Sequence, residues 1–187
     1  METFIRTYEN AASKSLCERI ISTFEIITLK NKKISVNRWG NALTRNDVSI
    51  FLQEHNIDNL VEELNATLNP CLNSYREEFG HIVNLFLTTK NFYKVQKTMP
   101  YGGYHIWHYE QLANDQDSHN RELVWTLYLN TMPDHEAETE FLYQKTKVQP
   151  KEGTVCIFPA AMTHLHRGLT VYSYPKYIAT GWYYIRE

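Results

Sequence analysis

The chain has 187 residues, a length at which we expect one compact domain with a sizeable core. Hydrophobic residues make up 43% and charged residues 21%, close to globular averages, which excludes an intrinsically disordered chain. The formal net charge of −2 gives no sign of the large basic surface that sequence-independent phosphate binding needs, so a nucleic-acid partner is disfavoured.

The cysteines and the first residues indicate where the protein resides. Cys17, Cys71 and Cys156 are odd in number and far apart, which argues against a disulfide framework or a zinc knuckle and favours a reducing compartment. The opening METFIRTYEN has no charged start followed by an apolar run, so we expect no signal peptide. The apolar stretch that follows is interrupted by Glu25 and is too short to cross a bilayer. We therefore expect a soluble, cytoplasmic protein with no membrane partner.

Helical periodicity marks the first 80 residues. Leu16, Ile20 and Phe24 fall on one face of a helix, which Asn10 or Ser13 could cap.

A second helical region carries apolar residues at helical spacing from Ile57 to Phe79. Thr44 and Asp47, three residues apart, resemble a capping arrangement before it. Pro70 should end or kink this region, because proline removes a backbone donor and clashes with the preceding turn.

After Gly80 the pattern changes to short runs of β-branched and aromatic residues. Such a series of short strands, preceded by helices, predicts an α+β protein, mainly β: an antiparallel sandwich or jelly roll with the N-terminal helices as a buttress. We treat residues 1–187 as a single domain, with a helical part at 1–80 and a β core at 81–187. The predicted strands are Val83–Thr89, Phe92–Thr98, Tyr104–Tyr109, Glu122–Asn130, Thr139–Leu142, Thr154–Phe158, Thr163–His166 and Lys176–Ile185.

The segment HIWHYEQ holds the most informative polar residues. On an extended strand His108 and Glu110 project to the same face, because side chains two apart share a face. An imidazole and a carboxylate so placed can fill two adjacent positions around a metal ion. A third ligand from another strand would complete the two-histidine, one-carboxylate triad typical of non-haem Fe(II) sites.

The third ligand is expected in the segment HLHRG. His164 and His166 are also two apart, and periodicity alone does not choose between them. Lys176 lies ten residues beyond His166, a separation that allows a turn and a return into the last strand. If Lys176 faces a pocket, it needs an anionic partner or a lowered pKa. A dicarboxylate that chelates the metal at one end and pairs with Lys176 at the other would supply that partner.

These segments resemble the Fe(II)/2-oxoglutarate-dependent dioxygenases, nearest to the prolyl 4-hydroxylase and hypoxia-type prolyl hydroxylase group. The resemblance covers roughly Phe92 to Ile185 and includes HYE (His108–Glu110), RELVWTLYLN (Arg121–Asn130), ETEF (Glu138–Phe141) and the closing Val148–Ile185. The family's closing pattern is a His, a Val, a basic residue, an aromatic residue and a Trp; the matching residues here are His166, Val171, Lys176, Tyr177 and Trp182.

The resemblance implies a double-stranded β-helix fold and a role for each matching residue. His108, Glu110 and His166 would bind Fe(II), and Lys176 would pair with the distal carboxylate of 2-oxoglutarate. The residues implied to line or bind the same cosubstrate are Tyr128, Thr180 and Trp182. O₂ is the other cosubstrate implied, with ascorbate as a reductant. The products would be succinate, CO₂ and a hydroxylated substrate, most simply a proline of a peptide or protein.

Two departures from the family pattern stand out. Glu110 takes the place of the more usual Asp, and Tyr174–Pro175 replaces a glycine-containing turn. Three alternatives stay open: hydroxylation of a free amino acid or another small molecule, a cupin-like metalloprotein that does not use 2-oxoglutarate, and a non-catalytic jelly-roll binding module. The cupin-like protein would not need Lys176, and the binding module would show no metal-dependent stabilisation.

Overall fold

A computed structural model describes residues 2–30, 35–37, 44–55, 57–80, 87–89, 93–111 and 118–185. The described part contains two α-helices, α1 (Lys14–Lys30) and α2 (Asp58–Phe79), and two 3₁₀ helices, η1 (Leu52–His55) and η2 (Met162–His164). All paired strands are antiparallel and form two sheets. The fold is therefore α+β, as the sequence predicts. No helix in these ranges is both long and apolar enough to cross a membrane.

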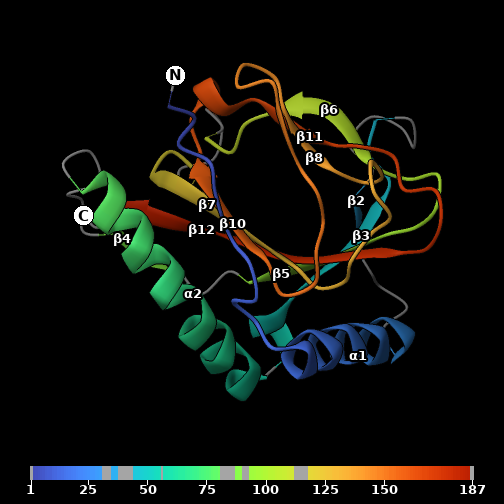
Figure 1. Cartoon of the computed structure of the whole chain (residues 1–187). Helices are drawn as coiled ribbons and strands as arrows, with labels where there is room; N and C mark the ends of the chain where they lie inside the picture. Colours follow the sequence, from blue (N-terminus) through green and yellow to red (C-terminus); the bar gives the residue numbers. More distant parts are fainter. Residues whose placement is uncertain are drawn as a thin grey trace.

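The large sheet has the order β1-β10-β7-β12-β5-β3-β2, with β4 also paired to β12. Its longest strand, β12, crosses the middle of the molecule in Figure 1. The strands of this sheet are β1 (Arg6–Tyr8), β2 (Ser35–Asn37), β3 (Asp47–Phe51), β4 (Leu87–Thr89), β5 (Lys94–Thr98), β7 (Arg121–Tyr128), β10 (Val155–Pro159) and β12 (Lys176–Ile185).

The small sheet has the order β6-β11-β8-β9. It contains β6 (Tyr104–His108), β8 (Thr139–Phe141), β9 (Thr146–Val148) and β11 (His166–Gly168). An isolated bridge between Arg45 and Tyr104 links β6 to the chain just before β3. The two sheets are therefore joined at this edge.

The large sheet uses its two faces differently, and β7 shows why. Leu123, Trp125 and Leu127 belong to the cluster that includes the buried face of both helices. The alternate residues Val124 and Tyr128 belong to a second cluster with Phe141 of β8 and Val148 of β9. Strand alternation thus places one face against the helices and the other toward the small sheet.

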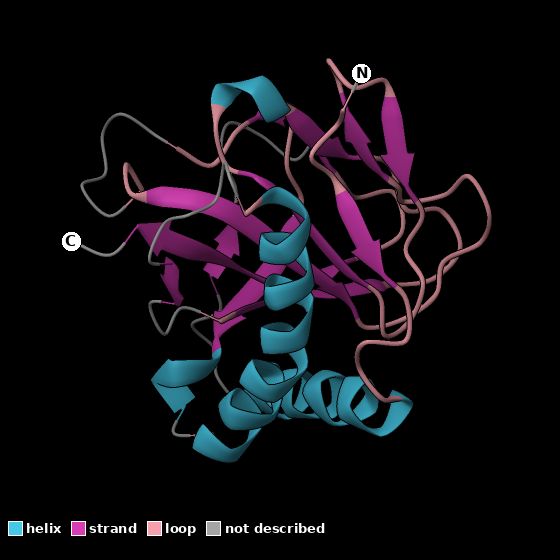
Figure 2. Cartoon of the chain, turned by 60° about the vertical axis from the view of Figure 1, so that its left-hand side comes forward, coloured by secondary structure: helices cyan, strands magenta, loops and turns pink. Residues whose placement is uncertain are grey.

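Both helices lie on the same side of the strands, as Figures 1 and 2 show. Ser13 caps α1, because its hydroxyl accepts the backbone N–H of Leu16 at 3.2 Å. The predicted apolar face of α1 is confirmed: Leu16, Ile20 and Phe24 are all buried in the helix-facing cluster.

The helix α2 does not end at Pro70 but continues through it to Phe79. Leu64 and Leu68 before the proline, and Leu72 and Tyr75 after it, are buried in one cluster. Packing of a continuous apolar face offsets the hydrogen bond that proline cannot make.

The capping arrangement predicted at Thr44 and Asp47 is wrong. Asp47 begins the strand β3, and α2 starts only at Asp58. The segment DVSIF alternates, with Val48 and Ile50 packed on the helix-facing cluster while Asp47 lines a cavity on the opposite face. A period of two over five residues therefore outweighs the local capping pattern.

Most predicted strands are confirmed within a residue or two, with one clear exception. Thr163–His166 is not a strand: η2 spans Met162–His164, and β11 begins at His166. The short strands β1, β2, β3 and β9 were not predicted. Only 87–89 of the predicted strand Val83–Thr89, and 93–98 of Phe92–Thr98, lie within the described residues.

Candidate metal centre

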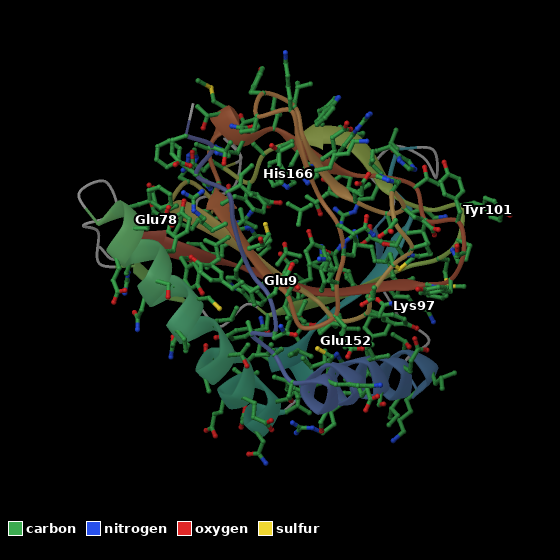
Figure 3. All side chains as sticks on the ribbon, viewed as in Figure 1. Glu9, Glu78, Lys97, Tyr101, Glu152 and His166 are labelled. Carbon is green, nitrogen blue, oxygen red and sulfur yellow. The ribbon has the colours of Figure 1, made fainter. Side chains whose placement is uncertain are left out.

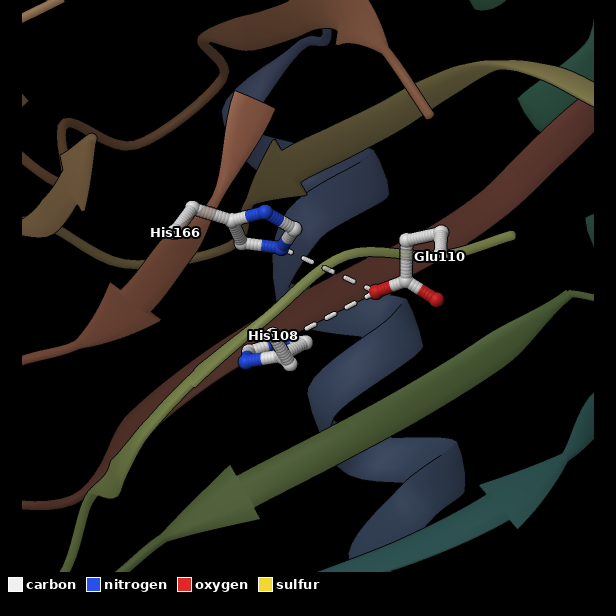
Figure 4. A group of neighbouring side chains, drawn as sticks. All are labelled: His108, Glu110 and His166. Atoms are coloured by element: carbon white, nitrogen blue, oxygen red, sulfur yellow. Dashed lines mark ion pairs between the residues drawn. The ribbon is translucent and has the colours of Figure 1, made fainter. Parts of the chain in front are cut away.

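Three predicted ligands meet at one point between the sheets. His108 ends β6, Glu110 follows two residues later, and His166 begins β11 directly opposite His108 in the strand pairing. One ligand atom from each lies within 4.8 Å of the others. The Nε2 atoms of His108 and His166 are each 3.7 Å from Oε1 of Glu110. Figure 4 marks these two contacts with dashed lines. In Figure 3, His166 lies within the strand part of the molecule, away from the helices.

Both imidazoles are oriented by backbone carbonyls. Nδ1 of His108 lies 2.9 Å from the carbonyl oxygen of Ile106, and Nδ1 of His166 lies 3.0 Å from that of His164. A carbonyl oxygen only accepts, so each Nδ1 carries the hydrogen and each Nε2 keeps its lone pair. The two lone pairs therefore point at the shared carboxylate oxygen, as metal ligands require.

Glu110 is held through its other oxygen. Oε2 accepts a hydrogen bond from the indole Nε1–H of Trp182 at 3.1 Å and lies 3.5 Å from the Arg121 guanidinium. The backbone N–H of Glu110 donates to the carbonyl of Ala160 at 3.0 Å. Oε1 is thus left facing the imidazoles, and the extra methylene of Glu relative to Asp is accommodated just beyond the end of β6.

The charge states at the centre suit a divalent cation. Burial alone would raise the pKa of the Glu110 carboxyl, but the positive charge of the Arg121 guanidinium beside Oε2 acts in the opposite direction and lowers it. Burial, with the neighbouring His166, lowers the pKa of His108 to about 4, so this imidazole is neutral near pH 7. An ionised carboxylate beside a neutral imidazole is the form that binds metal.

His164, the alternative third ligand, points away from this centre. It is buried, with Nε2 2.9 Å from the carbonyl oxygen of Thr3 and Nδ1 3.0 Å from the Thr163 hydroxyl. The expectation that His164 and His166 share a face fails because η2 breaks the strand between them. His164 acts on the site only through its carbonyl, which orients His166.

The three clustered residues, His108, Glu110 and His166, line a cavity of about 460 Å³ between the sheets. Alternate residues of β12, namely Lys176, Ile178, Thr180 and Trp182, form one wall of it. Because Trp182 contacts Glu110, Lys176 lies six residues along the same strand from the ligands. The cavity therefore has the metal ligands toward one end of this row and a cation at the other.

Lys176 is buried, with 7% of its surface exposed. Its Nζ donates to the carbonyl of Ala137 at 2.6 Å and lies 5.6 Å from the ring centre of Tyr128. No carboxylate in the described ranges pairs with it, and burial lowers its pKa to about 8. A buried lysine without a counter-charge is the arrangement that an anionic ligand would complete.

The remaining predicted residues surround the same space in different ways. Trp182 lines the cavity and holds Glu110, whereas the Thr180 hydroxyl donates to the carbonyl of Trp125 at 2.8 Å. Tyr128 is fully buried, and its hydroxyl lies 2.8 Å from the Thr139 hydroxyl. Thr139 lines the cavity, whereas Tyr128 stands behind it.

Sequence reasoning missed a polar group on the large sheet. Arg45 and Asp47 form a buried ion pair, and Gln96 donates to Asp47 at 2.6 Å. The Arg45 guanidinium stacks on Tyr104, whose ring stacks on His108 at 3.8 Å. Lys94 lines the cavity beside this group. The alternation of KVQKT predicts a strand with Lys94 and Gln96 on one face, but not which face meets the ligands.

The sequence from 93 to 184 matches the model of the 2OG-Fe(II) oxygenase superfamily. The matched stretch covers just under half of the chain, and it is similar to that superfamily. The match contains all three clustered ligands and Lys176 and leaves out the helices, in agreement with the span predicted from the sequence. The protein is therefore a 2-oxoglutarate-dependent non-haem iron oxygenase, which uses Fe(II), 2-oxoglutarate and O₂.

Solved structures of similar fold cover almost the whole chain. A viral collagen prolyl hydroxylase from Paramecium bursaria Chlorella virus-1, in a complex with 2OG, matches with a TM-score of 0.75 and 20% identity over 98% of this chain and 97% of that one. A Pseudomonas putida prolyl-4-hydroxylase matches with a TM-score of 0.71 and 14% identity over 99% and 94%. No curated protein matches the sequence.

A third structure adds a bound peptide. It is a prolyl hydroxylase from Trichoplax adhaerens, in complex with a fragment of the hypoxia inducible factor oxygen degradation domain, with a TM-score of 0.73 and 16% identity over 98% of this chain and 84% of that one. At these identities the likeness shows a shared fold, helices included.

Proposed function

We propose that His108, Glu110 and His166 bind Fe(II), and that Lys176 pairs with the distal carboxylate of 2-oxoglutarate. One observation carries the proposal: two lone-pair nitrogens and an ionised carboxylate converge in a cavity that also holds an uncompensated buried lysine. This donor set leaves open positions on Fe(II), as non-haem oxygenases need. When bound, Fe(II), 2-oxoglutarate and O₂ supply oxidative decarboxylation to succinate and CO₂ and hydroxylation of a C–H bond.

The protein's own residues position and shield this chemistry. The carbonyls of Ile106 and His164 fix the two imidazoles, and Trp182 keeps Glu110 from rotating. Apolar side chains of Val124 and Ile178 line the wall between the ligands and Lys176. An apolar wall strengthens the electrostatic attraction between Lys176 and a carboxylate, because water screens the two charges less there.

We also propose that the two sheets form a double-stranded β-helix, with the helices as a buttress, in one domain spanning 1–187. The face-to-face clusters of the two sheets and the packing of α1 and α2 on the outer face support this architecture. Residues 1–80 supply more than helices, because β1, β2 and β3 belong to the large sheet. The helical and β parts therefore share one core.

The substrate that we propose is a proline residue of a peptide or protein. The viral structure is of a collagen prolyl hydroxylase, and the Trichoplax structure holds a peptide fragment; both have this fold. The cavity is large enough to take a proline ring beside the cosubstrate, since pockets for small ligands begin at roughly 300 Å³. Hydroxylation would replace one hydrogen of the ring with a hydroxyl group.

An anaerobic titration tests the metal and cosubstrate assignments. Fe(II)-loaded protein is titrated with 2-oxoglutarate while the weak visible charge-transfer band of the chelate is followed. We expect a saturable band in the wild type, no band in His108→Ala, and in Lys176→Ala a band that needs far more 2-oxoglutarate. Bound iron without any band would instead favour a cupin-like protein, and the lack of iron binding would favour a binding module.

The substrate proposal is tested by 2-oxoglutarate turnover with proline peptides, with each peptide's mass as the second readout. We expect turnover to rise and the peptide to gain 16 Da, the mass of one oxygen atom. Turnover that rises only with free amino acids would refute a peptide substrate while leaving the metal and cosubstrate assignments intact.

A further inference from the structure

Lys94 is a second cation inside the cavity, placed away from Lys176. It lies on β5, where its Cα partners are Thr180 of β12 and Phe51 of β3. Lys176 pairs instead with Thr98, at the opposite end of β5. Lys94 and Lys176 are therefore separated by four residues along the paired strands, and both side chains line the cavity.

Among the described residues, Lys94 differs from the arginines of the cavity in having no ion pair, and from Lys176 in having no hydrogen bond through its ammonium group. Each arginine of the lining has a carboxylate within ion-pair distance: the pairs are Arg45–Asp47, Arg121–Glu110 and Arg167–Glu140. Lys94 makes neither a hydrogen bond nor an ion pair through its ammonium group with any residue in the described ranges. Asp47 and Glu110 are close enough to influence it. Asp47, however, is held by Arg45 and Gln96, and Glu110 is held by Trp182 and Arg121.

Burial, together with the nearby Arg45, lowers the pKa of Lys94 to about 8. A partly buried, unpaired ammonium costs folding free energy, and a bound anion would lower that cost. The carboxylates of 2-oxoglutarate do not supply this anion, because under the proposed function one chelates the metal and the other pairs with Lys176. The remaining molecule in the cavity is the substrate that is hydroxylated.

We propose that Lys94 binds a carboxylate of the substrate, so that the enzyme prefers a target proline next to an acidic residue or at a free carboxyl terminus. This inference rests on the proposed function. A single ammonium beside Asp47 suits a singly charged carboxylate better than a doubly charged phosphate, because Asp47 repels the second charge. Lys94 is thus a specificity-determining residue outside the metal site.

Matched peptide pairs test this role. In one set of peptides, the residue before or after a single proline is Asp in one member and Asn in the other, or Glu in one and Gln in the other. In a second set, one member has a free carboxyl terminus and the other a terminal amide. Free L-proline and prolinamide form a further pair. The proteins compared are the wild type, Lys94→Met, Lys94→Arg and, as an exposed control, Lys151→Met. Succinate formation and product mass are both measured, and KM for 2-oxoglutarate is determined for each protein. Thermal melting confirms that each variant is folded.

In the wild type we expect kcat/KM to favour the carboxylate member of at least one pair by about tenfold or more, the usual effect of one charge-assisted hydrogen bond. Lys94→Met should lose this preference, Lys94→Arg should keep most of it, and Lys151→Met should equal the wild type. KM for 2-oxoglutarate should stay within about threefold in all four, since no charged contact to the cosubstrate is lost.

Two results would overturn the inference about Lys94, and a third would overturn the proposed peptide substrate. Equal turnover of both members of every pair would leave the proposed function standing and remove the role of Lys94. A raised KM for 2-oxoglutarate in Lys94→Met, with the acidic preference unchanged, would assign Lys94 to the cosubstrate. If no peptide raises succinate formation, the proposed peptide substrate is wrong. If L-proline is then preferred over prolinamide, and Lys94→Met abolishes this preference, Lys94 still binds the substrate carboxylate.

Discussion

Binding of 2-oxoglutarate should take up protons, because Lys176 must be charged to hold the distal carboxylate. With the pKa of the free lysine lowered to about 8, roughly half of the side chains are neutral at pH 8. We therefore expect an uptake of about 0.5 proton per cosubstrate at pH 8, near zero at pH 6, and approaching one at pH 9. Above pH 8 the Kd for 2-oxoglutarate should rise about tenfold per pH unit.

Anaerobic calorimetry of the Fe(II)-loaded protein, in buffers of different ionisation enthalpy, measures this uptake directly. Lys176→Arg is the matched control, since guanidinium stays protonated throughout this range while keeping the positive charge. The comparison also isolates Lys176 from Lys94, whose pKa is lowered to about 8 as well. Equal proton uptake by the wild type and Lys176→Arg would refute the reasoning, since Lys176 would then not be the group that gains the proton.

The same lysine should limit stability in the absence of ligand. Its lowered pKa means that, between pH 8 and 10.5, the unfolded chain holds the proton that the folded protein has lost, so the free energy of unfolding rises with pH across this window. Below pH 8 the full cost of the buried charge is present, about 3 kcal/mol for a pKa lowered from 10.5 to about 8. Lys176→Met should therefore raise the melting temperature at pH 7 while weakening 2-oxoglutarate binding. A lower melting temperature would contradict this account.

Three further substitutions test contacts that support the site or the fold. Trp182→Phe removes the hydrogen bond to Glu110 and should weaken Fe(II) affinity by about 10–100-fold, measured by competition with a chelator; unchanged affinity would show that the bond is not needed. Arg45→Met leaves Asp47 buried without its partner and should lower the free energy of unfolding by about 3–5 kcal/mol in urea titrations, whereas a loss below about 1 kcal/mol would mean that the pair is not buried in solution. Pro70→Ala restores a helical hydrogen bond and should raise the free energy of unfolding by up to about 3 kcal/mol, and a decrease would show that α2 needs the proline.

The cluster of His108, Glu110 and His166 could be predicted from the sequence because it depends on short spacings. His108 and Glu110 are two residues apart, and strand geometry alone places them together. The choice of His166 over His164 needed the spacing to Lys176 and the family pattern. Strand periodicity could not distinguish His164 from His166, because it places both on the same face of the predicted strand Thr163–His166. In the structure a 3₁₀ helix over Met162–His164 takes the place of most of that strand.

Local sequence patterns could not predict that Arg45, Asp47 and Lys94 come together on the large sheet. Arg45 and Asp47 lie in a segment whose capping pattern competes with a five-residue alternation, and the alternation prevails only because β5 pairs with β3. Lys94 sits on a correctly predicted strand, but its partners Thr180 and Phe51 are 86 and 43 residues away in the chain. Long-range pairing decides which face of a strand lines a cavity. Strand alternation shows only which residues share a face, and not where that face points.

The division of the site between two sheets has a mechanical consequence. His108 and His166 belong to the small sheet, whereas Lys176 belongs to the large one. A cosubstrate held at both ends is thus an additional cross-link between layers that are also joined by apolar packing, the Arg45–Tyr104 bridge and the Tyr128–Thr139 hydrogen bond. Amide hydrogens of β6 and β11 should therefore exchange more slowly when metal and 2-oxoglutarate are both present than with either alone. Binding of metal and 2-oxoglutarate would therefore fix the small sheet to the large one before any substrate arrives.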